Sequence, residues 1–196
     1  GLSAILGFDF KKSDKNKDGT SREKYSLSVG QVFRSERNED IPSKSSLDQK
    51  SSDIVGELNY NFLSVGSIDY KFSLDHNLND VNYTDLEANL ILGNTSFSLN
   101  YLEENNHIGT SNYIKSGITV DFDNSSKLNF NIKKNLETES TEFYDLAYDY
   151  VNDCLKAGLL FRREFYTDRD VASSDSLMFR ISLFPFGEAS SPLIDR

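Results

Sequence analysis

The chain has 196 residues, 37% of them apolar and 12% aromatic, which is a composition of ordered rather than disordered proteins. Its formal net charge of −10 argues against nucleic-acid binding, because neutralising phosphates requires a basic surface. No run of 18 or more apolar residues occurs, which excludes a transmembrane helix but not a membrane β-barrel, whose strands mix polar with apolar positions.

The N-terminal residues alternate between apolar and polar side chains, and this period of two predicts a strand over about residues 1–11. A polar loop over residues 11–22 precedes a second strand. The apolar side of that strand consists of Tyr25, Leu27, Val29 and Phe33. Residues 35–53 are polar and of low complexity, so we expect a mobile loop there that supports no site.

Alternating hairpins follow, each with an apolar and a polar face, and they bring the total to about eleven strands with no helix of useful length. Short turns lie near residues 64, 93, 124 and 153. Longer polar connections lie near residues 43, 79, 107, 139 and 170. Such alternation indicates an up-and-down meander with two unlike rims, as in outer-membrane barrels.

The last third of the chain, residues 154–186, shows the pattern most clearly. Leu155, Ala157, Leu159 and Phe161 share one parity in its first arm. Leu177, Phe179, Ile181 and Leu183 share one parity in its second arm. A polar loop rich in Asp and Ser separates the arms, so we expect two antiparallel neighbours.

Periodicity alone leaves open whether the apolar face points to a protein core or to lipid, because soluble sandwiches and lipocalin-like barrels show the same pattern. Strand length favours lipid, since arms of about eleven residues tilted near 40° span roughly 25 to 28 Å, the height of an outer-membrane apolar band. Aromatic residues at strand ends add to this interpretation, because they resemble interfacial belts.

The polar parity then faces a wet lumen. Its expected lining residues are Glu57, Asp69, Lys71, Asp85, Glu87, Lys115, Asp121, Lys133 and Arg180. His76 and His107 lack ligand spacing, so we expect no metal site from them, although acidic loops remain candidates for Ca²⁺ or Mg²⁺. No catalytic constellation and no cofactor motif stand out, so we expect no enzyme.

An odd strand number and a start within a strand predict that the chain, residues 1–196, is the C-terminal portion of a larger barrel whose N-terminal strands are absent. The fold expected is therefore all-β: an antiparallel up-and-down meander, part of a large transmembrane outer-membrane β-barrel.

The residues YVNDCLKAGLLFRREFYTDRDVASSDSLMFRISLFPFG also resemble the C-terminal end of the LptD family of outer-membrane proteins, also called OstA or organic solvent tolerance proteins. The close likeness covers about residues 144–187. It implies assembly of lipopolysaccharide (LPS) into the outer leaflet through a very large barrel with a periplasmic N-terminal domain, and this domain is expected to be absent from residues 1–196. It also implies an LptE-like lipoprotein plug and periplasmic LPS bridge components as partners.

Two site expectations follow from the resemblance. Family members carry cysteines at the turn that holds Cys154, and these form disulfides with the N-terminal region, so Cys154 is expected to form one bridge on the periplasmic side. A buried unpaired thiol is the alternative. The last strand, residues 176–186, is expected to meet the first strand at a lateral seam for lipid. Its seam residues are Ser176, Phe179, Ile181, Leu183 and Pro185.

The expected function is LPS transport in the outer membrane of a Gram-negative cell, with the C-terminus on the periplasmic side. A porin or other diffusion channel is the first alternative. A soluble secreted β-sheet protein that binds carbohydrate is the second, and it predicts a buried apolar parity.

Overall fold

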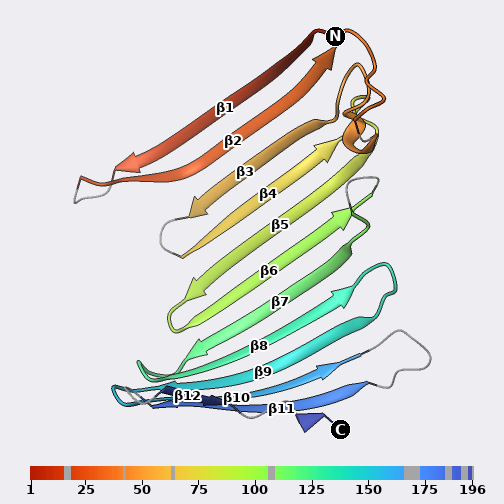
Figure 1. Ribbon diagram of the computed structural model, residues 1–196. Coiled ribbons are helices and arrows are strands. Elements are labelled where there is room, and N and C mark those ends of the chain that lie inside the picture. Colours follow the sequence, from red (N-terminus) through yellow and green to blue (C-terminus); the bar gives the residue numbers. More distant parts are fainter. Residues whose placement is uncertain are drawn as a thin grey trace. The chain divides into compact units, whose positions relative to one another are not determined.

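A computed structural model describes residues 1–15, 19–41, 43–62, 65–105, 109–165, 173–183, 187–190 and 194–195 of the chain. These residues form an all-β protein whose strands are neighbours in chain order, from β1 to β12, as Figure 1 shows. The predicted antiparallel meander is thus confirmed. In the described residues no helix is both long and apolar enough to cross a membrane.

The strands have the length that the alternation predicts. Their bounds are β1 Ser3–Lys15, β2 Ser21–Arg34, β3 Ile54–Phe62, β4 Gly66–Leu74, β5 Val81–Leu92, β6 Thr95–Glu104, β7 Asn112–Asp121, β8 Ser126–Asn135, β9 Thr141–Val151, β10 Leu155–Glu164, β11 Ser174–Leu183, β12 Gly187–Ser190 and β13 Ile194–Asp195. One short 3-10 helix, η1 (Lys44–Ser46), lies between β2 and β3. Long and short connections alternate between the strands, which confirms the predicted pair of unlike rims.

The chain divides into two compact units. The first comprises Gly1–Asn89 with Asn100–Asn112, and the second comprises Leu90–Leu99 with Tyr113–Arg196. In the first unit β1, β2, β3 and β4 pair antiparallel in succession. In the second unit β7 to β11 pair in the same way, and β12 and β13 both pair with β11.

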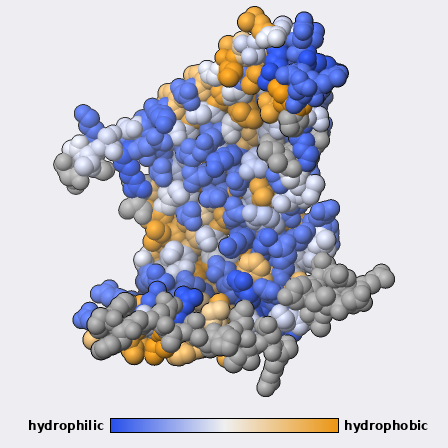
Figure 2. Space-filling model, in the orientation of Figure 1, coloured by the Kyte–Doolittle hydropathy of each residue, from blue (hydrophilic) through white to orange (hydrophobic). Residues whose placement is uncertain are grey.

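Register keeps apolar residues on one face of each ladder, because side chains alternate along a strand and paired residues point to the same side. In the first unit Leu58 pairs with Leu27 and with Tyr70. One position earlier, Glu57 pairs with Ser28 and Lys71. Hydrophilic residues cover most of the face seen in Figure 2 over the middle strands, with hydrophobic residues at its margins.

The apolar face covers no core. No hydrophobic residue in the described part of the chain is buried, and Leu159 and Phe179 are 45% and 48% exposed. The buried side chains in the described part of the chain are polar: Ser26, Ser52, Asp53, Ser73, Asn82, Asp145 and Ser176. This is the reverse of a soluble sandwich, in which the apolar parity fills the interior.

Several boundaries differ from the expected ones. The first strand extends to Lys15, and β2 begins at Ser21, because the polar residues at these strand ends pair across the hairpin and form two exposed ion pairs. The last long strand, expected over residues 176–186, is β11 and ends at Leu183. Beyond it, β12 and β13 add two short strands on the other side of β11 from β10, and the alternation did not predict them.

Residues 35–53, expected to be a mobile loop of low complexity, contain local structure. They contain η1, and the backbone amide of Asp53 donates to the carbonyl of Ser45 at 3.1 Å. At their C-terminal end Ser52 bonds to β2, where the Val32 amide donates to its hydroxyl at 3.0 Å. The segment is therefore tied to the sheet by long-range hydrogen bonds, which composition does not encode.

Candidate functional site

The predicted lumen residues of the first unit share one face. Glu57 and Lys71 are direct cross-strand partners, and Asp69 pairs with Asn59. Glu57 and Lys71 also line a cavity of about 470 Å³ together with Ser28, Ser73 and Tyr83. The structure thus brings two of the predicted residues to the wall of one hollow.

Asp85 on β5 belongs to the same unit and is half-buried. Its carboxylate accepts hydrogen bonds from the Tyr83 hydroxyl and from Asn100 Nδ2, both at 3.3 Å. Glu87, two residues further along the strand, is exposed. The polar parity of β5 therefore combines a fixed carboxylate with a solvent-exposed one.

The second unit holds the other predicted lumen residues. Asp121 forms an ion pair with Lys127 at 3.3 Å, and both side chains are about half exposed. Lys115 pairs with Lys133 in register. Lys133 is neutralised by Glu142 at 2.7 Å, and its ammonium lies 4.4 Å from the centroid of the Tyr113 ring. Arg180 pairs with Gly158 and is exposed.

A buried carboxylate network that the pattern did not single out lies on the same face of this unit. Asp145 accepts from Asn131 Nδ2 at 2.9 Å and from Arg162 at 2.8 Å. Arg162 also approaches Glu164 at 3.6 Å, and its guanidinium carbon lies 4.7 Å from the centroid of the Phe143 ring. The network joins three adjacent strands, β8, β9 and β10, by charge-assisted hydrogen bonds.

The polar face of this unit also carries an apolar patch. Leu160 pairs with Ala147 on one side and with Met178 on the other. These three residues, with Gly158 and Arg180, line a small cavity of about 140 Å³. Leu160 and Met178 share the parity of Arg162 and Arg180 and therefore lie on the polar face. The expectation that apolar residues lie only on the opposite face is wrong at these two positions.

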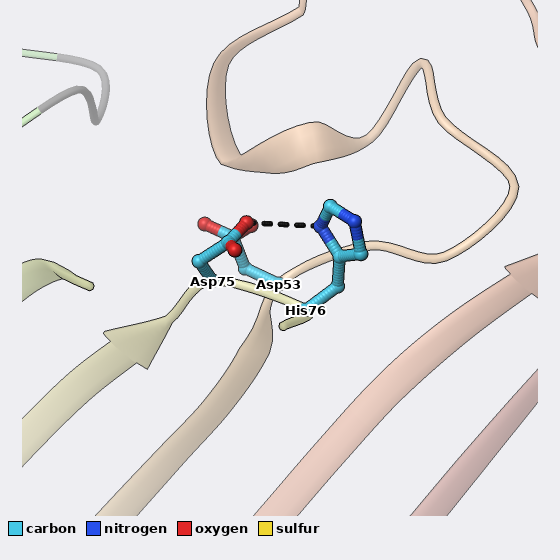
Figure 3. A group of neighbouring side chains, drawn as sticks. All are labelled: Asp53, Asp75 and His76. Carbon is cyan, nitrogen blue, oxygen red and sulfur yellow. Dashed lines mark ion pairs between the residues drawn. The ribbon is translucent and has the colours of Figure 1, made fainter. Parts of the chain in front are cut away.

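A second buried cluster lies in the first unit where β4 ends and β5 begins. Asp53 is 1% exposed, and its Oδ2 accepts from the Ser73 hydroxyl at 3.1 Å and from Asn82 Nδ2 at 2.8 Å. Asp75 lies beside it and is paired with His76, whose Nδ1 is 2.9 Å from Asp75 Oδ1 (Figure 3). Residues 35–53 and His76 were expected to contribute no site, and the structure brings both to one place.

Asp75 is ionised at neutral pH. Partial burial acts to raise its pKa, but hydrogen bonds from Asn77 and the charge of His76 outweigh burial and lower the pKa below its ordinary value of 3.8. The cluster therefore holds a negative charge next to a buried carboxylate.

Cys154 lies in the turn between β9 and β10 and is exposed with a free thiol. Its backbone amide donates to Asn152 Oδ1 at 3.0 Å, as does the amide of Leu155 at 2.8 Å. Exposure contradicts the alternative of a buried thiol. The register of Leu155 with Leu183 places this turn beside the described end of β11.

Comparison with protein families decides the class to which these features belong. A family model described as "LptD: LPS transport system D" matches residues 2–136, which is more than half of the chain. The chain belongs to the LPS transport system D family. The match covers residues upstream of 144–187, where the resemblance was expected to be closest, so the family is shown by the upstream part and the likeness of residues 144–187 stays a prediction.

Membership of the LptD family supports LPS transport and an outer-membrane location, and members are transport components rather than enzymes. A comparison with curated protein sequences found no match.

Among solved structures, two engineered variants of the porin from Rh. blastica align over 99% of this LptD-family chain and 91% of their own, at 11% and 10% identity, each with a TM-score of 0.49. A structure described as "Asymmetric conductivity of engineered proteins" aligns over the same shares at 10% identity and a TM-score of 0.48. Likeness at this level carries no argument about function.

The seam residues expected for an LptD-family chain lie on β11, apart from Pro185, which lies outside the described residues. Phe179, Ile181 and Leu183 share the apolar parity, whereas Ser176 is buried on the polar one. The side of β11 away from β10 is paired with β12 and β13. The lateral seam itself stays a prediction.

Proposed function

We propose that this chain supplies the C-terminal strands of an outer-membrane LPS translocon, with its apolar parity toward lipid and its polar parity toward a wet passage for LPS. The observation that carries the proposal is the inverted burial of the sheet: polar residues are the buried ones, and no described hydrophobic residue is buried. The family match adds the substrate class.

The polar face offers groups suited to a passage for LPS, whose sugars and phosphates need hydrogen-bond donors and cations. Lys71 is exposed on the polar face of the first unit, where Asn59 lies in the same ladder, and Lys115 and Arg180 are exposed on the polar face of the second unit. Acidic residues on the same face keep the lining hydrated and prevent tight anion binding. Such a mixed lining permits transit rather than capture.

Cys154 and β11 extend the proposal. An exposed thiol in a short turn is available for one disulfide with an N-terminal region, and that pairing holds a periplasmic domain under the barrel. A lateral seam at β11 requires that β12 and β13 dissociate from β11. The first strand of the barrel would pair with the same backbone N–H and C=O groups of β11 that β12 and β13 now occupy. The LptE-like plug, the periplasmic bridge partners and the periplasmic position of the C-terminus remain part of this proposal.

The test is site-specific photo-crosslinking in cells that produce the full-length protein. A photoreactive residue at position 57 or 71, on the polar parity, is expected to yield LPS adducts. The same residue at position 58 or 70, on the apolar parity of the same two strands, serves as the matched control and is expected to yield phospholipid adducts. LPS adducts at neither polar position would overturn the proposal.

Conductance measurements distinguish the proposed translocon from the alternative function, a porin. A diffusion channel passes small ions steadily when the full-length protein is reconstituted in a planar bilayer. It also shows no LPS adduct at position 57 or 71.

A further inference from the structure

The buried cluster where β4 ends and β5 begins has one carboxylate oxygen without a hydrogen bond. Asp53 Oδ2 is held by Ser73 and Asn82, whereas Asp53 Oδ1 is buried and has no hydrogen-bond partner. Leaving a buried acceptor unpaired costs free energy, because the group has lost its hydrogen bonds to water and gained none in return. Asp53 takes part in no ion pair found among the described residues, so the structure shows a buried anionic oxygen that needs a positive partner.

Two more ligating groups converge on Asp53. One ligand atom each from Asp53, Asp75 and His76 lies within 4.8 Å of the others. Figure 3 shows the imidazole of His76 turned toward the carboxylates of Asp53 and Asp75. They come from two segments, the end of the 35–53 connection and the residues that follow β4.

The spacing suits one small divalent ion. Carboxylate oxygen and imidazole nitrogen ligands lie about 2.0 to 2.2 Å from such an ion, so two ligands on opposite sides are about 4.0 to 4.4 Å apart. The three ligand atoms lie within 4.8 Å of one another, so movements of a few tenths of an ångström bring them to these separations. The 2.9 Å between His76 Nδ1 and Asp75 Oδ1 matches two ligands at adjacent positions.

The ligand types select the ion. Ca²⁺ and Mg²⁺ take oxygen ligands, whereas Zn²⁺ and Mn²⁺ accept mixed oxygen and imidazole sets. We propose that Asp53, Asp75 and His76 bind one Zn²⁺ or Mn²⁺ ion, with Ser73 and Asn82 as positioning residues that orient Asp53. This inference goes beyond LPS transport and does not depend on it.

Binding through Nδ1 fixes the state of the histidine. The proton of the neutral imidazole must then be on Nε2, which lies 3.1 Å from Asn77 Nδ2. Rotation of the Asn77 amide by half a turn presents its oxygen as the acceptor for that proton. Asn77 thus becomes an outer partner of the ion, of the kind that commonly orients a metal-bound imidazole.

The structural consequence is a clamp. Residues 35–53 connect β2 to β3, and an ion held by Asp53 together with Asp75 and His76 ties the end of this connection to the β4–β5 connection. The ion supplies a positive charge beside the Asp53 carboxylate, whose Oδ1 has no hydrogen-bond partner. Removing the ion is expected to loosen residues 35–53 while the strands remain paired.

The experiment uses the full-length protein in detergent, stripped with a chelator and titrated with Zn²⁺ and separately with Mn²⁺ by isothermal calorimetry. One site is expected in the wild type that His76→Ala weakens by at least about tenfold. His76 is partly exposed, so this variant tests the site without a risk to folding. Asp53→Asn is the second variant, and Asp80→Asn, an exposed carboxylate in the same connection, is the matched control with unchanged affinity.

A second readout reports the clamp. Amide hydrogen exchange at residues 35–53 is expected to slow on addition of the ion in the wild type and in Asp80→Asn, but not in His76→Ala. The proposal is overturned if wild type and His76→Ala bind Zn²⁺ and Mn²⁺ equally. It is also overturned if only Ca²⁺ or Mg²⁺ binds, because an oxygen-only site excludes the histidine.

Discussion

Arg162 and Asp145 are bonded at 2.8 Å across β10 and β9, and Asp145 is only 6% exposed. The Arg162 side chain is 37% exposed, so solvent screens part of the interaction. Asp145 also accepts from Asn131, which extends the link to β8. The pair therefore anchors the polar face of the second unit.

Arg162→Met is expected to lower the free energy of unfolding of the full-length protein by about 1 to 2 kcal/mol, because Asp145 stays buried with one partner lost. Urea titration in lipid vesicles measures the change. Lys127→Met is the control, since the Lys127–Asp121 pair is about half exposed and is worth about 0.5 kcal/mol or less. Equal losses in the two variants would show that burial of Asp145 does not matter.

Gly56→Ala is expected to destabilise the first unit by about 1 to 2 kcal/mol through overpacking. A Cβ at Gly56 meets the ring of Phe72, its cross-strand partner, which is stacked on Tyr70 with ring centroids 5.6 Å apart. The ring must leave this stack to make room. Gly7→Ala is the matched control, because its nearest contact is an ordinary 3.5 Å to the Val29 carbonyl.

Unfolding free energies of the two glycine variants provide the measurement. The Gly56→Ala loss should shrink in a Phe72→Leu background, since the shorter side chain leaves space. A Gly56→Ala protein as stable as Gly7→Ala would contradict the predicted contact.

Asp123 contributes a pH-dependent part of stability. The amides of Ser125 and Ser126 donate to its Oδ1 at 2.7 and 2.6 Å, and the Ser125 bond is the main cause of a pKa below the ordinary 3.8. A lowered folded-state pKa stabilises the protein above the unfolded-state value. This stabilisation is lost as the pH falls through the folded-state pKa.

Asp123→Asn keeps an acceptor oxygen but cannot titrate. The stability advantage of the wild type over this variant is therefore expected at pH 6 and should shrink below about pH 4. Urea midpoints across this range measure it. An advantage that is constant down to pH 2 would exclude the carboxylate as its source.

Cys154→Ser is expected to abolish a mobility change between reducing and non-reducing electrophoresis of the full-length protein. The thiol is exposed in a turn, so it is accessible to a cysteine of another region. The variant must still reach the membrane for the comparison to hold. Identical mobility of the wild type with and without reductant would remove the disulfide from the proposal.

Much of the fold could be predicted from the sequence, because strand periodicity is a local property. Residues two apart lie on one side, so Leu58 and Glu57 were assigned to opposite faces before any pairing was known. The alternation of long and short connections predicted the meander, and the family was identified correctly. Strand length only favoured an apolar face that meets lipid, and this orientation stays a prediction.

What the sequence determined by itself is therefore the long strands, the faces of most of their residues and their order. Tertiary structure decided the rest: the burial of Asp53 against Ser73 and Asn82, the partnership of Asp145 with Arg162, and the place of Leu160 and Met178 on the polar face. These depend on contacts between residues 17 to 29 positions apart or on cross-strand register. Local sequence patterns do not encode such contacts, because residues far apart in sequence meet only in the folded chain. The energy of a buried charge is set by its neighbours in space.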